Sequence, residues 1–229
     1  MQMSDTIMIE LKNIDPEDIS DVLVKVENSF DFKFCETELN EVETFGELCD
    51  IILSKVQGEN INDCTTQQVF YKLRNAITVT QLVDKDTITP DTTLQQLFPR
   101  HNRRQKIIEL QNELDIPIDI LDIKEWLGWT IFAGIIISIV MFFFKWQFGL
   151  SGLIFFIAVG WIANKFFAKE FAIATVRQLA EKLSRENYIK SRRNGGTINR
   201  NEIEQKVKEF FSKELALEEE VLTRKATFV

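Results

Sequence analysis

The side chains best placed to do chemistry form a basic cluster at the start of a helix predicted over residues 102–114. They are Arg100, His101, Arg103 and Arg104. Each positive charge there lies against the positive end of the helix dipole, which costs a few tenths to about 1 kcal/mol. An anionic partner would remove this cost, and two are candidates: a lipid headgroup, or a second predicted helix start that is acidic. The acidic residues of that second start are Asp15, Glu17, Asp18 and Asp21. Plain solvation of the arginines is the alternative.

Catalytic and metal-binding patterns are missing from the sequence. It has no glycine-rich phosphate loop, no GxSxG and no HExxH, and its single histidine, His101, has no neighbouring cysteine or serine. The cysteines Cys35, Cys49 and Cys64 lack CxxC spacing, and one histidine is too few for a common zinc site. We therefore predict a protein that is not an enzyme, has no cofactor or metal, and keeps its cysteines reduced.

The net charge is spread unevenly along the chain. Residues 1–65 contain 16 Asp and Glu against 4 Lys, a net charge of −12, whereas the whole chain has −8, which leaves +4 for the remainder. An acidic segment of this kind repels nucleic acid and anionic lipid and attracts basic protein surfaces. We therefore expect a basic-surfaced protein partner and no nucleic acid.

Residues 126–167 form an almost uninterrupted apolar block, in which only Lys145 and Lys165 are charged. The block is about twice the ~20 apolar residues that one bilayer crossing needs. It therefore predicts a hairpin of two transmembrane helices joined near Lys145. All four tryptophans lie near the ends or the middle break of the block, as suits side chains at a membrane interface. They are Trp126, Trp129, Trp146 and Trp161.

Two alternatives to a double crossing stay open at this point. A hydrophobic helix pair inside a soluble core has the same composition. Re-entrant or tilted insertion of the second segment is the other alternative, because the polar residues Gln147, Ser151 and Asn164 interrupt it.

Basic residues beside the block predict its orientation. The turn between the segments offers only Lys145. The flanks carry Arg103, Arg104, Lys106 and Lys124 before the block, and Lys165, Lys169, Arg177, Lys182 and Arg185 after it. Positive charge gathers on the cytoplasmic side, so both termini are expected in the cytoplasm. Residues 1–20 are acidic and lack a continuous apolar core, so no signal peptide is expected.

Capping patterns and apolar periodicity predict the helices that position these residues. The expected caps are Asp15 with Pro16, Thr44 with Glu47, and Thr65 with Gln68. Later helices are expected over residues 169–193, closed by the basic run KSRRNGG, and from Asn201 onward. Each carries an apolar stripe, so each is expected to bury one face in a small helical core.

The order of these pieces resembles the acyl carrier protein family. Residues 65–120 are similar in helix length and hydrophobic spacing, with TTQQVFYKLRNAI, a loop containing ITPDTTLQQLF, and RRQKIIELQNEL. The stretches DPEDISDVLVKVENSFDFKF and VETFGELCDIILSKV resemble later helices of the same fold, and EIEQKVKEFFSKELALEEEVLTRKATFV is similar to its first helix and loop. The resemblance implies that both ends of the chain complete one circularly permuted bundle. The alternative is that the C-terminal helix packs against another subunit.

The resemblance also locates the position at which carrier proteins attach phosphopantetheine through a serine. That position falls near Pro16 in the first bundle and near Arg100 in the second, and neither side chain can carry a phosphodiester. Ser20 lies about one helical turn later and is a weak alternative site. The resemblance therefore implies two carrier folds without a prosthetic group, with phosphopantetheine kept only as an alternative cofactor.

We therefore predict an all-α protein with two small acyl-carrier-like helical bundles and a two-helix transmembrane hairpin. The expected segments are an N-terminal carrier-like segment over residues 1–58, completed by residues 201–229, a second carrier-like unit 65–122, the hairpin 126–167, an amphipathic helix 168–194, and a C-terminal helix and tail 195–229.

The layout is similar to membrane-anchored acyl-carrier-like proteins of Bacteroidota bacteria, so a bacterial inner membrane is the expected location. The expected function is that of an interaction or scaffold module, with membrane lipid and a basic-surfaced protein as partners. Its acidic surface would lie on residues 15–27 and 36–47, and a second copy of the chain is another candidate partner. The alternatives are an immunity or toxin-neutralising membrane protein, and a working carrier that presents acyl chains at the membrane.

Overall fold

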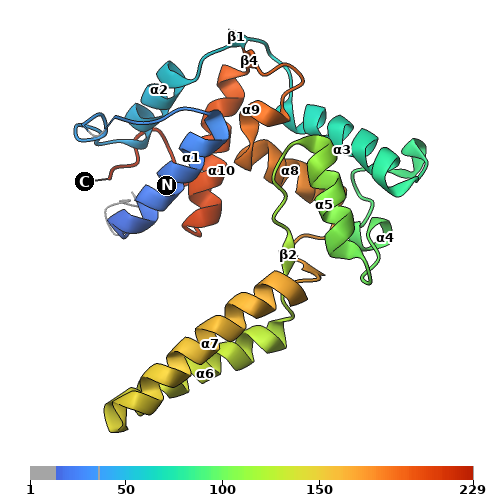
Figure 1. The fold of residues 1–229 in the computed structure, drawn as a ribbon. Helices are drawn as coiled ribbons and strands as arrows, with labels where there is room; N and C mark the ends of the chain where they lie inside the picture. The colour runs from blue at the N-terminus through green and yellow to red at the C-terminus, as the bar shows by residue number, and fades with distance from the viewer. Residues whose placement is uncertain (1–13, 36, 229) are drawn as a thin grey trace, which may run out of the picture. The chain divides into compact units, whose positions relative to one another are not determined.

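A computed structural model describes residues 14–35 and 37–228 of the chain (Figure 1). The described residues contain ten α-helices and are 62% helical, which confirms the mainly helical class. Two pairs of two-residue strands depart from the all-α prediction. The chain divides into two compact units, here called the first unit, Met1–Leu73 with Leu179–Val229, and the second unit, Arg74–Gln178.

The first unit brings the N-terminal and C-terminal segments into one hydrophobic core. Its elements are α1 (Pro16–Phe30), α2 (Phe45–Lys55), β1 (Glu59–Asn60), the first half of α3 (Thr65–Gln81), most of α8 (Val176–Glu186), α9 (Tyr188–Ser191), β4 (Thr197–Ile198) and α10 (Arg200–Glu214). The last helix, α10, contacts both α1 and α2. The rings of Phe45 and Phe211 meet edge to face, with centroids 5.3 Å apart. After α10, the Phe228 backbone N–H donates to the Glu43 carbonyl oxygen at 2.9 Å.

The apolar faces predicted for α1, α2 and α10 are buried in this core. Side chains at most 3% exposed are Val22, Val26 and Phe30 in α1, Phe45, Leu48, Cys49, Ile52 and Val56 in and after α2, and Ile203, Val207, Phe210 and Phe211 in α10. Fully burying one large apolar side chain contributes about 1.5–3 kcal/mol. Burial of these faces therefore accounts for the association of segments that are far apart in sequence.

Two of the predicted helix starts are confirmed. The Asp15 side chain accepts a hydrogen bond from the Glu17 backbone N–H at 3.0 Å, and Pro16 is the first residue of α1. At α2, the Thr44 hydroxyl accepts from the Glu47 backbone N–H at 3.2 Å, and the Glu47 carboxylate accepts from the Thr44 backbone N–H at 3.0 Å. These bonds satisfy N–H groups that have no partner within the helix.

The capping box predicted for Thr65 and Gln68 is wrong. Helix α3 begins at Thr65 itself, and the Thr65 hydroxyl donates to the Glu202 carboxylate at 2.5 Å. The Gln68 amide donates to the Asp63 carboxylate, also at 2.5 Å. Charged acceptors make stronger hydrogen bonds than backbone groups do, so these partners replace the local cap. Helix α10 also begins before the predicted Asn201, because Asn199 caps it.

The polar stretch after Gly58 contains the strand β1. It pairs in parallel with β4, so that Glu59 lies opposite Thr197 and Asn60 opposite Ile198. Gly58 has φ +155°, and a Cβ on it would lie 2.8 Å from the Ile198 side chain. The close approach of β4 therefore requires glycine at this position.

The second unit combines short helices, a small sheet and a long helical hairpin. Its elements are the second half of α3, a 3₁₀ turn η2 (Lys85–Thr87), α4 (Leu94–Leu97), α5 (Arg103–Leu114), β2 (Leu121–Asp122), α6 (Glu125–Phe144), α7 (Trp146–Phe167), β3 (Glu170–Phe171) and the start of α8. Strands β2 and β3 pair antiparallel directly before and after the hairpin. This sheet therefore ties together the two ends of the hairpin.

The helix predicted over residues 168–194 is shorter than expected and broken. Residues 170–171 pair with β2, and Thr175 forms an isolated bridge with Thr93, so α8 begins only at Val176. The Gln178 side chain accepts from the Ala174 backbone N–H at 2.7 Å and so fixes this start. The chain then breaks at Asn187, and α9 covers only Tyr188–Ser191. Strand pairing with distant segments overrides the local helical pattern, and the periodicity of apolar residues gives no information about such pairing.

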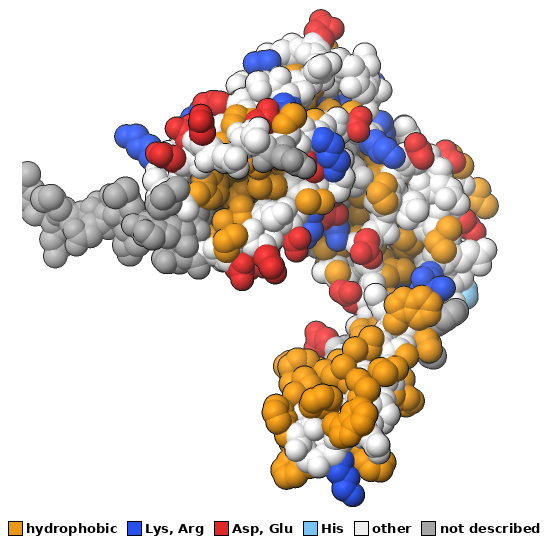
Figure 2. Space-filling view, turned by 60° about the vertical axis from the view of Figure 1, so that its left-hand side comes forward, with side chains coloured by type: hydrophobic (Ala, Val, Ile, Leu, Met, Phe, Trp, Pro, Cys, Tyr) orange, Lys and Arg blue, Asp and Glu red, His pale blue; other side chains and the backbone are white. Residues whose placement is uncertain are grey.

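Helices α6 and α7 are long and apolar enough to cross a membrane, and only 11% of the most apolar 18-residue stretch of each is buried. Hydrophobic side chains cover this hairpin on the face seen in Figure 2. Phe143 and Phe144 are 84% and 80% exposed. A soluble core pair would bury these faces, so the exposure favours the predicted membrane hairpin over the soluble alternative.

Candidate functional site

The acidic start of α1 is one of two candidate binding surfaces. Asp15 caps the helix, and Glu17, Asp18 and Asp21 are exposed to solvent. Among the described residues, none of these four carboxylates forms a salt bridge. Ser20, predicted as a weak alternative attachment site, is exposed, and so is Pro16, near which the resemblance predicts the carrier attachment position. The first turn of α1 thus presents negative charge that no ion pair neutralises within residues 14–35 and 37–228.

An apolar hollow of about 250 Å³ adjoins this acidic turn. Its lining residues are Ile14, Pro16, Ile19, Leu23, Leu39, Val42, Leu48 and Phe228. Three of them alternate along α1 with the acidic residues, so one helix supplies both negative charge and apolar surface. We call this combination the acidic docking surface; its charged members are Asp15, Glu17, Asp18 and Asp21.

The other acidic stretch, residues 36–47, is only partly occupied within the protein, since Glu41 and Glu43 are exposed. Glu36 lies outside the described residues. Glu38 pairs with Lys55 at 2.8 Å, and Glu47 serves the cap of α2. Hydrogen bonds from the backbone N–H groups of Glu43 and Thr44 lower the pKa of Glu47 below its usual range. Glu38 and Glu47 therefore have structural partners, whereas Glu41 and Glu43 flank Val42 in the lining of the hollow and extend the negative charge beside α1.

The basic cluster around the start of α5 is the second candidate surface. Its residues differ in burial and in their partners. Arg103 is 5% exposed. Its Nε donates to the Phe98 carbonyl oxygen at 3.0 Å, NH1 donates to the Lys169 carbonyl oxygen, and the guanidinium lies 4.2 Å from the centre of the Phe171 ring. Arg103 was predicted as an interaction residue for a partner, and this burial contradicts that role. Carbonyl oxygens inside the unit and the Glu170 carboxylate, 3.9 Å from NH1, compensate its charge.

The neighbouring basic residues stay accessible. Arg100 is about half exposed and pairs with Glu170 at 2.6 Å. Arg104 donates to the Asn164 carbonyl oxygen at 3.4 Å, near the end of α7. His101 is exposed. The start of α5 therefore lies beside the base of the hairpin, which brings several residues of the predicted basic cluster to the boundary of the apolar segment.

Two cavities lie at this boundary. One, of about 380 Å³, is lined by Arg104, Ile107, Ile108, Gln111, Ile118, Asp119, Leu121, Trp161, Asn164, Lys165 and Ala168. The other, of about 560 Å³, is lined by Arg100, His101, Lys124, Trp126, Leu127 and Lys169. The second has no acidic residue in its lining, and we call it the basic cavity.

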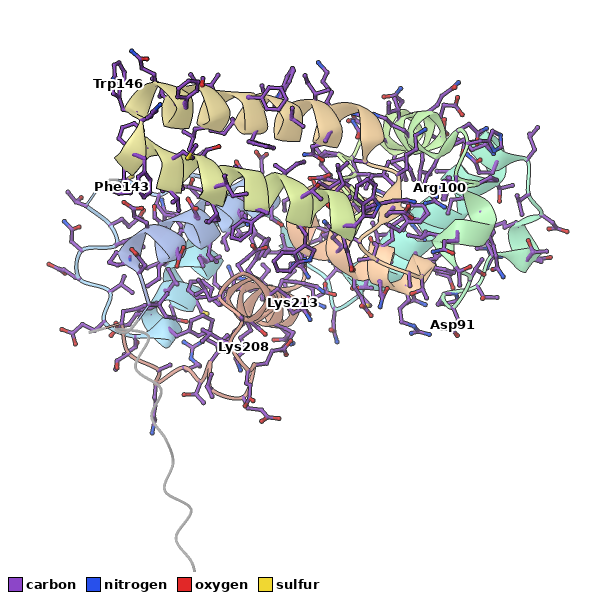
Figure 3. All side chains as sticks on the ribbon, turned by 90° about the horizontal axis from the view of Figure 1, so that it is seen from below. Asp91, Arg100, Phe143, Trp146, Lys208 and Lys213 are labelled. Carbon is purple, nitrogen blue, oxygen red and sulfur yellow. The ribbon has the colours of Figure 1, made fainter. Side chains whose placement is uncertain are left out.

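The predicted membrane-interface residues divide between the two ends of the hairpin. Phe143 and Trp146 lie at its turn, at the opposite end from Arg100 (Figure 3). Lys145 separates the two helices there. Trp126 and Trp129 belong to the first turns of α6, and Trp161 to the last turns of α7, where its ring lies 4.8 Å from the Lys165 ammonium. This distribution suits two headgroup boundaries.

A buried arginine, Arg192, is not recognisable from the sequence, where it lies in the basic run KSRRNGG predicted to close a helix. It is 1% exposed and lies in the first unit. Its Nε donates to the Thr197 hydroxyl at 3.1 Å, and NH1 donates to the Thr65 hydroxyl at 2.8 Å and the Tyr188 hydroxyl at 3.3 Å. NH2 forms an ion pair with Asp63. Every nitrogen of the guanidinium thus has a partner.

Glu202 completes this network as a second carboxylate. Its Oε2 lies 3.9 Å from Arg192 NH1, and Glu202 also accepts from the Thr65 backbone N–H at 3.0 Å. Burial raises the pKa of Tyr188, whose hydroxyl accepts from the Asn199 backbone N–H at 3.0 Å. The network is closed within the first unit, which favours a structural role over ligand binding.

Cysteine chemistry offers no site. The three cysteines are free thiols, with Cys49 buried and Cys35 and Cys64 exposed. No group of three or more His, Cys, Asp or Glu among the residues that the structure describes is arranged to hold a metal ion. Burial raises the pKa of Cys49 to about 12, so its thiol stays protonated and poorly nucleophilic in the folded protein.

We expect iodoacetamide to alkylate Cys35 and Cys64 in the folded protein and to reach Cys49 only after unfolding, as peptide mass mapping would reveal. The raised pKa favours the folded state at low pH. The contribution of this pKa difference to the free energy of unfolding is fully present below about pH 9, the pKa of an unperturbed thiol. It is lost as the pH rises through about 12, the pKa of Cys49 in the folded protein. Equal labelling of all three cysteines under native conditions would refute the burial of Cys49.

No family model, no curated protein sequence and no solved structure matches this chain.

Proposed function

We propose that this protein is a non-enzymatic, membrane-anchored interaction module that holds a carrier-like helical bundle at a bilayer surface. The hairpin of α6 and α7 is the anchor, and the acidic docking surface of α1 binds a protein partner. The single observation that carries the proposal is the accessible acidic turn beside an apolar hollow. We propose that both termini lie in the cytoplasm, because basic residues flank the hairpin. Reporter fusions to the C-terminus would show on which side of the membrane that terminus lies.

The carrier-like character in this proposal rests on the packing of the first unit. Helix α10, which is similar in sequence to a carrier's first helix, packs against α1 and α2, which resemble later carrier helices. This arrangement is the one expected of a circularly permuted bundle. Pro16 at the attachment position removes the hydroxyl that acyl carriage needs, so we propose that the fold is kept for its surface.

The docking surface defines the chemistry of the partner. Lysine or arginine side chains would pair with Glu17, Asp18 and Asp21, and an apolar side chain would enter the hollow beside Ile19 and Leu23. An amphipathic helix with one basic face and one apolar face supplies both from a single segment. Charge complementarity would chiefly set the rate and specificity of association, and burial of the apolar side chain would add affinity.

The test begins with a photo-crosslinking amino acid in place of Glu17 in the full chain, expressed in its native cells. Mass spectrometry of the solubilised membranes identifies the cross-linked protein. Binding of that protein is then compared between the wild type and the double variant Asp18→Lys, Asp21→Lys. Like charges facing a basic partner cost several kcal/mol, so we expect at least a roughly tenfold weaker interaction.

The matched control is Glu218→Lys with Glu220→Lys, which makes the same change in net charge on exposed residues after α10. It should retain the partner. Full binding by the α1 variant, or equal loss in both variants, would sink the docking proposal. A phosphopantetheine adduct on a serine-containing peptide of the same preparation would favour the working-carrier alternative instead.

A further inference from the structure

The basic cavity lies where the short helices of the second unit meet the start of the membrane hairpin. Lys124 immediately precedes α6, Trp126 and Leu127 are in its first turn, and Lys169 follows α7. Arg100 and His101 come from the turn before α5. Three separate segments therefore converge on a volume of about 560 Å³ at the end of the apolar hairpin, where lipid headgroups would lie if the hairpin spans a bilayer as proposed.

The charge in this cavity is positive and only partly neutralised from within. Arg100 pairs with Glu170, which lies outside the lining. The side chains of Lys124 and Lys169 have no salt bridge among the described residues. Lys124 is exposed and Lys169 is half-buried. Two lysines thus line a hollow that has no carboxylate-bearing residue in its lining.

The remaining lining suits an amphiphilic ligand. Trp126 is 62% exposed and, with Leu127, gives one side of the cavity an apolar wall that continues into α6. No side chain caps the N-terminus of α6, and the free N–H groups of a helix start favour an anion. Phosphate beside the lysines and glycerol and acyl chains along α6 would use both parts of the cavity.

We propose that the basic cavity binds the phosphate of an anionic phospholipid headgroup. The inference rests on insertion of the hairpin in a bilayer, as proposed above, but not on the docking surface of α1. Basic pockets beside transmembrane helices bind such headgroups on the cytoplasmic side. The wild-type protein should therefore prefer an anionic lipid to a zwitterionic one of equal chain length.

The experiment titrates the full-length, detergent-purified protein with phosphatidylglycerol or phosphatidylcholine and measures retained lipid by native mass spectrometry. We expect at least about tenfold tighter retention of phosphatidylglycerol, and roughly a twentyfold loss of it in the double variant Lys124→Gln, Lys169→Gln. The single variant His101→Gln tests the same cavity with a smaller expected loss. The matched control is Lys85→Gln with Lys106→Gln, which removes the same charge outside the lining, and it should retain the lipid.

Other outcomes overturn the inference. Equal retention of both lipids would remove the anionic preference, and equal losses in the two double variants would indicate diffuse attraction rather than a site. Competition by millimolar inorganic phosphate would assign the cavity to a soluble anion. Flotation with vesicles separates the two proposals: a protein that does not float contradicts the membrane anchor, whereas one that floats without lipid selectivity contradicts only this site.

Discussion

Replacing Arg192 by methionine is expected to destabilise the first unit by roughly 3 kcal/mol, the lower end of the range found when one partner of a buried ion pair is removed, because Asp63 is itself 38% exposed. The substitution keeps a long side chain but deletes every guanidinium hydrogen bond. Asp63 loses its ion pair, and Glu202 is left 14% exposed without a nearby positive charge. Arg192→Lys should recover only a fraction of the loss, because an ammonium group cannot reproduce the planar set of donors.

The matched control is Arg193→Met. Arg193 is the next residue and is exposed, so its removal should change the free energy of unfolding by no more than about 0.5 kcal/mol. Urea titrations followed by far-ultraviolet circular dichroism would measure both variants. All four tryptophans lie in the hairpin, so their fluorescence should be the same in wild type and variants. Equal stability of the Arg192 and Arg193 variants would mean that the network is not structural.

Substituting Gly149 by alanine is the second large effect, and it acts on the hairpin. A Cβ at Gly149 would lie 2.4 Å from Cα and 2.5 Å from the backbone nitrogen of Phe142. Backbone atoms cannot rotate away, so α6 and α7 must separate near their turn. Overpacking of this kind costs about 1–3 kcal/mol. Without a hydrophobic driving force between helices in lipid, close approach at small residues is a main source of their association.

Gly160 on the same helix supplies the control. A Cβ there would lie 3.5 Å from the Ile131 side chain, an ordinary contact. Gly160→Ala should therefore be neutral, or stabilising by up to about 1 kcal/mol through helix propensity. Thermal unfolding in detergent, followed by tryptophan fluorescence, would report on the hairpin directly. A Gly149→Ala variant as stable as Gly160→Ala would contradict the close packing of the two helices.

Local patterns were sufficient to predict the hairpin and several helix starts. A transmembrane segment is recognised by composition over about 20 residues, and Lys145 interrupts the apolar block between the two helices. The caps of α1 and α2 involve residues at most three positions apart, Asp15 with Glu17 and Thr44 with Glu47. Apolar stripes repeat every helical turn, so the buried faces of α1, α2 and α10 could also be read from the sequence.

Only the tertiary structure determined which individual polar residues are buried and which groups they bind. Arg103 and Arg192 both occur in basic runs that look like solvated surface, yet each is buried with hydrogen-bond partners. The partners of Arg192 at Asp63 and Thr65 are 129 and 127 positions away. The strand pairing that delays α8 to Val176 likewise joins β3 to β2 across the whole hairpin.

The basic cavity could not be predicted from the sequence for the same reason. Its two lysines, at positions 124 and 169, precede and follow the hairpin in the sequence and come together only in the folded chain. Helical periodicity and membrane partitioning depend on residues that are neighbours along the chain, so both can be predicted from the sequence alone. The solvation of a charge depends on which distant groups surround it after folding, and that is determined only when the segments pack together.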